Sequence, residues 1–243
     1  MTTPPDPEAD PGTSPGPAPA VQLADPAHRE AVVDLLGAMA YGELTAFSRL
    51  AADAELAPTL SDKAKMARQA ATELHHYELL EKSLQEIGAD VRTAMQPFVG
   101  AVDAFHDRTR PSTWLEGLVK AYVGDGIAAD FYREVSAYLD PDTRALVLNV
   151  LQDLGAAQFA VDAVREAIER DPAVAGRLAL WARRLLGEAL SQAQRVAAER
   201  DALASLLIGG RGVYGPDLAE IGRVFARLTD EHTRRMTRLG LSA

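Results

Sequence analysis

The sequence of 243 residues contains no cysteine, no long apolar run and no strand-type run in which apolar and polar residues alternate. The lack of cysteine excludes disulfides, iron–sulfur clusters and thiolate metal sites. No apolar run approaches the roughly 20 residues that a membrane-spanning helix needs, so we expect no membrane segment. Basic residues are also in deficit. The formal net charge of −10 argues against broad electrostatic adhesion to nucleic acid or anionic membranes.

The first twenty residues are rich in proline and hold seven of the fourteen prolines of the chain. They have neither a basic start nor an apolar stretch, so they do not have the character of a signal peptide, and we expect a cytoplasmic protein. They also offer almost nothing apolar to bury. We therefore predict a disordered tail at residues 1–24, followed by a single helical domain at residues 25–240.

Helix-forming residues dominate the rest of the chain, which predicts an all-α fold. The expected helices cover residues 26–53, 61–86, 113–139, 141–170, 172–208 and 216–240, with a short helix at 98–105 inside the long connection 89–110. Asp-Pro pairs at residues 140–141 and 171–172 have the N-cap pattern, and Gly88 is a helix terminator. Two hairpins joined by a long crossover predict a ferritin-like four-helix bundle at residues 26–170, with two extra C-terminal helices at 172–240.

Each of the four bundle helices interrupts its apolar stripe with one acid. In chain order these acids are Glu43, Glu73, Asp125 and Asp153. An isolated buried carboxylate is costly, and a bound cation is the simplest compensation for four of them. His76 lies three residues after Glu73 and shares its helix face, which is the Glu-x-x-His spacing of di-metal sites in bundle cores. The same spacing also occurs in ordinary surface ion pairs.

The acids are level with one another along the predicted bundle. With a rise of about 1.5 Å per residue, Glu43 and Glu73 each lie roughly 16 Å from their shared turn. Asp125 and Asp153 lie roughly 21 and 18 Å from theirs. The spacing therefore predicts two half-sites that meet midway along the bundle.

Two segments resemble a known family. The segment ATELHHYE at residues 71–78 resembles the second-helix signature of the ferritin-like methylthio-isopentenyl-adenosine tRNA hydroxylases, which are di-iron monooxygenases. The segment YVGDGIAADF at residues 122–131 is similar to that family's third helix, with Asp125 in place of glutamate. The similarity covers roughly residues 30–168 and is closer to actinobacterial ferritin-like proteins that are grouped with these hydroxylases.

The resemblance implies a site and partners. It implies one or two iron ions, or manganese, as the cofactor, an electron donor, and tRNA as a possible substrate. The implied metal ligands are Glu43, Glu73, His76, Asp125 and Asp153.

One departure from the family pattern leaves three functions open. The second Glu-x-x-His is replaced by Asp153-Leu154-Gly155-Ala156, and Ala156 cannot bind metal. Glu43, Glu73 and His76 alone could hold a single iron, as a carboxylate-rich facial site. The leading hypothesis is a non-haem iron oxygenase of hydroxylase type. The alternatives are a metal-free ferritin-like binding or structural protein with a degenerate site, and an iron-storage or ferroxidase protein.

Smaller features carry further expectations. The only basic clusters are Arg183-Arg184, Arg234-Arg235 and Arg108 with Arg110, which would form either a tRNA-binding rim or ordinary ion pairs. Gly124 and Gly126 flank Asp125 and indicate either a π-bulge or close helix packing. We expect Asp130 and Glu134 on a solvated face, and His106 and His232 at the surface. A homodimer through the C-terminal helices is also possible.

Overall fold

The computed structural model describes residues 23–152, 156–207 and 218–243, and throughout these residues the protein is all-helical. The prediction of an all-α fold is therefore confirmed. The predicted tail, residues 1–24, lies almost entirely outside the described residues. None of the helices in the described ranges combines the length and the apolar character needed to cross a membrane. The elements are α2 (Pro26–Asp53), η1 (Ala54–Leu56), α3 (Leu60–Glu86), α4 (Val91–Met95), η2 (Gln96–Phe98), α5 (Val99–Arg108), α6 (Trp114–Ser136), α7 (Pro141–Val150), α8 (Ala156–Arg170), α9 (Ala173–Glu199), α10 (Asp201–Leu207) and α11 (Leu218–Leu239).

Several helix ends lie where local side chains cap them. The Asp25 carboxylate accepts a hydrogen bond from the Ala27 N–H at the start of α2. The Thr113 hydroxyl accepts one from the Glu116 N–H at the start of α6. Gly88 follows α3 with a φ of 71°, a left-handed conformation that glycine adopts at little cost. These caps explain why the predicted ends at Pro26, Glu86 and the start of α6 agree with the structure.

Three expectations about the helices were wrong. The helix expected at residues 141–170 is broken after Val150 into α7 and α8, and the helix expected at 172–208 is broken at Arg200 into α9 and α10. The helix expected to end at residue 139 ends at Ser136. The short helix expected at 98–105 is present as α5, and the long connection also holds α4 and η2.

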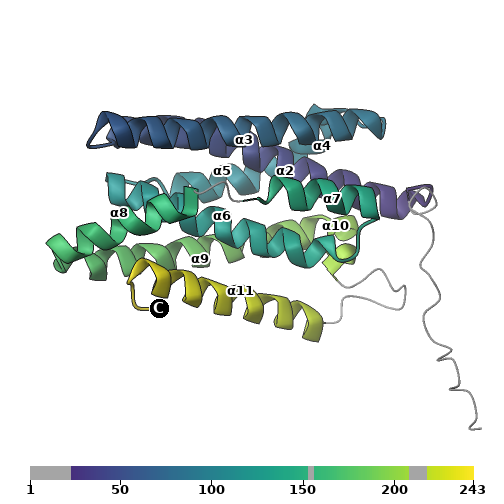
Figure 1. Ribbon diagram of the computed structural model, residues 1–243. Helices are drawn as coiled ribbons and strands as arrows, with labels where there is room; N and C mark the ends of the chain where they lie inside the picture. Colours follow the sequence, from purple (N-terminus) through teal and green to yellow (C-terminus); the bar gives the residue numbers. More distant parts are fainter. Residues whose placement is uncertain (1–22, 153–155, 208–217) are drawn as a thin grey trace, which may run out of the picture.

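The helices pack in two groups that Figure 1 shows from the side. Helices α2 and α3 form one long hairpin, with α3 along one edge of the molecule. Helix α6 packs against α8, α9 and α11, and α11 lies along the opposite edge. Helix α5 also packs on α9.

The hydrophobic core is divided into two clusters. One contains Leu50, Ala70, Ile127 and Ala160, and the other contains Met39, Leu80, Val135 and Val150.

The gap between the two clusters falls at a similar height along each bundle helix. Glu43 lies between Met39 and Leu50 on α2, and Glu73 and His76 lie between Ala70 and Leu80 on α3. The break between α7 and α8 lies between Val150 and Ala160. We refer to Glu43, Glu73 and His76 as the polar layer.

An ion pair ties the N-terminal half of α2 to the junction of α9 and α10. Arg200 donates two hydrogen bonds to the Asp34 carboxylate, at 2.5 and 2.9 Å, and the Asp34 side chain is only 5% exposed. Arg200 leaves the helical conformation, with φ −130° and ψ 85°. This tertiary contact coincides with the second break that the sequence pattern missed.

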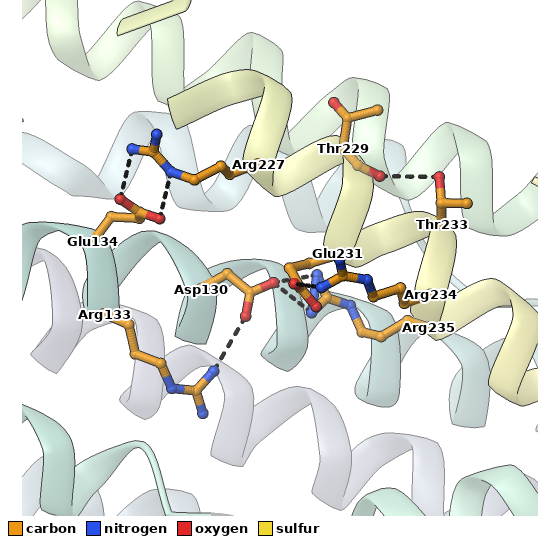
Figure 2. Close-up of polar contacts among 9 residues, drawn as sticks. All are labelled: Asp130, Arg133, Glu134, Arg227, Thr229, Glu231, Thr233, Arg234 and Arg235. Carbon is orange, nitrogen blue, oxygen red and sulfur yellow. Dashed lines mark hydrogen bonds and ion pairs between the residues drawn. The ribbon is translucent and has the colours of Figure 1, made fainter. Parts of the chain in front are cut away.

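Helix α11 is held on α6 by two further ion pairs (Figure 2). The guanidinium of Arg235 donates two hydrogen bonds of 2.6 Å to Asp130, and that of Arg227 donates two of 2.8 Å to Glu134. Asp130 and Glu134 therefore face α11, and the expected solvated face was wrong. The structure also buries His232 of α11, which is 3% exposed, and leaves His106 only partly exposed.

We expect Arg200→Met to lower the free energy of unfolding, because it leaves the Asp34 carboxylate buried without its partner. Losing one partner of a fully buried pair costs roughly 3–5 kcal/mol. Arg200 is itself 30% exposed, so we expect about 2–3 kcal/mol here. Urea denaturation measures the change.

Arg195→Met is the matched control. Arg195 pairs with Glu199 on the same helix, and both side chains are about half exposed. Such a pair contributes about 0.3–0.5 kcal/mol. Equal effects of the two variants would contradict the role assigned to the Asp34–Arg200 pair.

Candidate metal centre

Three of the five predicted ligands converge in the polar layer. Glu43 comes from α2, and Glu73 and His76 come from α3. His76 Nδ1 lies 3.6 Å from Glu43 Oε2 and 3.6 Å from Glu73 Oε2. One ligand atom of each residue lies within 4.8 Å of the others. The side chains of the three residues are between 11% and 14% exposed. The long hairpin of α2 and α3 therefore supplies the whole cluster.

Burial and mutual contact change the protonation of this cluster. Burial, together with the neighbouring Glu43, raises the pKa of Glu73 to about 8, although His76 works against this shift. Hydrogen bonds to Glu43 and then to Glu73 raise the pKa of His76 to about 9. At neutral pH the metal-free cluster thus carries a protonated imidazole between the carboxyl groups. Protons occupy the place where a cation would sit.

The donor set fits a metal ion. Two carboxylates and one imidazole form a carboxylate-rich set, the reverse of the two-histidine, one-carboxylate facial triad of non-haem iron enzymes. A glutamate from one helix with a Glu-x-x-His from its neighbour is the set that one half of a bundle-core di-metal site uses. Replacing the protons by a divalent cation would let both carboxylates ionise inside the bundle. The residues present therefore suit iron or manganese, with Glu43, Glu73 and His76 as ligands.

Asp125, the fourth predicted ligand, is not part of this cluster. Asp125 of α6 is exposed, and its Oδ2 accepts a hydrogen bond of 3.1 Å from Gln69 Nε2. Gln69 lies one turn before Glu73 on α3, so Asp125 faces the same hairpin at a different height. Asp153 lies outside the described residues. A ligand set that includes Asp125 and Asp153 stays a prediction.

A tyrosine whose site role the sequence did not indicate stands beside the polar layer. Tyr132 of α6 is partly buried, and burial together with the charge of Glu43 raises the pKa of its phenol. The hydroxyl therefore stays protonated near the Glu43 carboxylate. Tyr132 lies seven residues after Asp125, on the same helix face. That spacing is the only sequence signal that could have placed it.

The neighbouring residues of the ATELHHYE segment face outward. His75 Nδ1 lies 3.6 Å from Glu78 Oε2, and both side chains are more than 60% exposed. This agrees with the interpretation that only Glu73 and His76 of that segment belong to the site.

The two glycines beside Asp125 have different surroundings. Helix α6 is α-helical across both, so the structure has no π-bulge there. A Cβ on Gly126 would lie 2.5 Å from Arg235 Cδ and 2.7 Å from Arg235 Nε, whereas a Cβ on Gly124 would have nothing within 4 Å. Close helix packing therefore accounts for Gly126. It does not account for Gly124.

We expect Gly126→Ala to destabilise the protein by about 1–2 kcal/mol, because the methyl group displaces Arg235 from its ion pair with Asp130. Gly124→Ala is the control. It should stabilise the protein by up to about 1 kcal/mol through helix propensity alone. Thermal or urea unfolding compares the two variants, and the same sign for both would contradict this packing.

We expect Glu73→Gln to leave the stability of the metal-free protein nearly unchanged toward about pH 4, where the carboxyl is protonated in the folded state and largely protonated in the unfolded chain. Near pH 7 the variant should be more stable than the wild type, because the unfolded wild-type chain gains the ionisation of Glu73 and the folded state does not. Toward about pH 9 the wild type should lose stability. The pKa values of Glu73 and His76 are raised in the folded state, so that state binds more protons than the unfolded chain. Over the same pH range the Glu73→Gln variant should lose less stability than the wild type. Unfolding in the presence of a chelator measures this difference.

The same variant separates metal binding from folding. Ferrous or manganous ion at about 100 times its Kd should stabilise the wild type by about 2.7 kcal/mol, and the variant by much less. Since bound metal displaces protons, the stabilisation should be larger at higher pH. A metal response in Glu73→Gln equal to that of the wild type would remove Glu73 from the ligand set.

Comparisons with known proteins agree with this architecture. Among curated proteins, nothing matches the chain. Among solved structures, the fold is similar to a chain described as Protein 19 with aldehyde deformylating oxidase activity from Synechococcus, at 20% identity and a TM-score of 0.67, over 91% of this chain and 94% of that one. A likeness at this identity shows the fold alone. The model of a family described as "Ferritin-like domain, actinomycetes" matches residues 26–210, more than half of the sequence, and the chain belongs to that family.

Proposed function

We propose that the protein is a non-haem iron enzyme of oxidase or oxygenase type. The observation that carries this proposal is the convergence of Glu43, Glu73 and His76 in the polar layer, where one ligand atom of each lies within 4.8 Å of the others. Iron held there would supply the reductive activation of dioxygen. An electron donor is then required, and no feature of the described residues identifies it.

The residues of the chain have separate tasks at this site. Glu43 and Glu73 would neutralise the charge of a divalent ion, and His76 would give up its proton and serve as the nitrogen ligand. Tyr132 keeps a protonated hydroxyl beside Glu43 and can donate a hydrogen bond at that position. The two apolar clusters on either side of the polar layer limit the access of water.

The resemblance to tRNA hydroxylases supports hydroxylation as the reaction type. The oxidase activity of the protein whose solved structure is similar supports an oxidase. The basic clusters give tRNA little support as the substrate. Arg235 is only 11% exposed and pairs with Asp130, while Arg234 pairs with Glu231. Arg108 pairs with Glu188, and Arg184 donates a hydrogen bond to the Arg108 carbonyl.

The remaining alternatives stay predictions. The position of Asp125 outside the cluster favours the metal-free binding protein over a complete five-ligand site. An iron-storage protein requires a large hollow shell, which native mass would reveal. A homodimer through the C-terminal helices would have to use surfaces other than the apolar side of α11, since Val224, Leu228 and Met236 are buried within the chain.

Metal content tests the proposal directly. We expect about one iron per chain after anaerobic loading with ferrous ion, because the described residues supply the ligand set of one half-site. Glu73→Ala, His76→Ala should lose it. The control is His75→Ala, Glu78→Ala, which alters an exposed pair on the same helix and should keep the metal. Mass spectrometry gives the stoichiometry, and oxygen consumption with a chemical reductant gives the reaction.

The outcomes separate the candidates. Two irons per chain would mean that Asp125, Asp153 or other groups complete a second position. No bound iron in the wild type would overturn the proposal and leave the metal-free binding protein. Many irons per chain, at the mass of a large shell, would favour storage.

A further inference from the structure

Helix α11 carries a histidine in the middle of its buried stripe. Val224, Leu228, Met236 and Leu239 are buried on one side of the helix, and His232 occupies the same side at 3% exposure. Neither ring nitrogen of His232 has a hydrogen-bond partner among the described residues. A neutral imidazole has one donor and one acceptor, and burying both without partners is costly. An apolar side chain of similar size would avoid that cost, so the histidine breaks the pattern of its own helix.

The charged groups on and around α11 come from α11 itself, from α6 and from α8. On α11 itself, Arg235 follows His232 by one turn and Glu231 precedes it. On α6, Asp130 and Glu134 pair with Arg235 and Arg227, and Arg133 lies beside them. On α8, Arg165 donates a hydrogen bond of 2.7 Å to the Arg238 carbonyl. Helix α9 shares an apolar cluster with α11 through Leu178 and Leu185.

These surroundings keep the imidazole neutral. Burial and then the positive charge of Arg235 lower the pKa of His232 to about 4. Protonation would place a second cation beside the guanidinium of Arg235, whose carboxylate partner Asp130 is already engaged. An undocked α11 would expose the imidazole to water and remove both penalties.

We propose that α11 is an acid-released strap, docked on α6, α8 and α9 while His232 is neutral and released when His232 is protonated. The region matched by the family model ends at residue 210, before α11 begins, so release would leave the family domain intact. It would uncover the face of α6 that carries Gly126, Asp130 and Glu134. This proposal does not depend on metal binding.

The direction of the pH dependence follows from the pKa. The docked state binds protons less readily than the released state, in which the pKa of histidine is ordinary. Docking is therefore strongest above about pH 6.5 and weakens as the pH falls toward about 4.

Hydrogen exchange of the full chain, read by mass spectrometry at pH 7.5 and pH 5 and corrected for intrinsic rates, tests the strap. We expect the protection of α11 peptides to fall at least about tenfold at the lower pH, while α2 and α3 keep theirs. His232→Leu should keep α11 protected at both pH values. His106→Gln is the control and should behave like the wild type in α11. His106 is a second histidine whose pKa burial lowers, and it lies on α5.

Two results would overturn the strap. One is equal protection of α11 at both pH values in the wild type. The other is a loss in His232→Leu as large as in the wild type, which would show that His232 is not the group whose protonation releases α11. His232→Met offers the same comparison if the leucine variant does not fold.

Discussion

Three ionisable side chains buried together between α2 and α3 are the constraint around which the bundle is arranged. Their position divides the core into two apolar clusters, and each bundle helix crosses from one cluster to the other at that height. The fourth helix does so through the break between α7 and α8. Without a cation the layer must hold protons that would otherwise be lost at neutral pH, because two carboxylates cannot both ionise cheaply inside the bundle. The same cost makes the layer a good host for a divalent metal.

The outer helices are attached to this centre by charge as well as by apolar packing. Asp34 and Arg200 join α2 to the junction of α9 and α10, and Asp130 and Arg235 join α6 to α11. In both pairs a largely buried carboxylate accepts two hydrogen bonds from one arginine. Such pairs fix where a helix sits more than they add to stability. Arg235 also explains why residue 126 has no side chain, since its guanidinium lies where a Cβ would be.

Much of the fold could be predicted because its signals are local. Helix ends depend on caps and terminators a few residues away, so Pro26, Glu86 and the start of α6 were recoverable from the sequence. The three-residue spacing of Glu73 and His76 places both on one helix face in any α-helix. Glu43 lies in the apolar stripe of a helix that forms a hairpin with theirs. Three members of the candidate site therefore come from one hairpin, whose geometry depends little on the rest of the chain.

The remaining features depend on contacts between distant segments. Asp125 has the right periodicity, yet it bonds to Gln69, one turn before Glu73, because the placement of α6 is set by its packing on α9 and α11. His232 and Asp130 read as surface residues until α11 is placed on α6. By itself the sequence determined the all-α class, most of the helices and the Glu43, Glu73 and His76 cluster, because periodicity and hairpin pairing are short-range. Only the tertiary structure decided which way α6 turns, where long helices break and which charges are buried, because those outcomes depend on how separate helices pack.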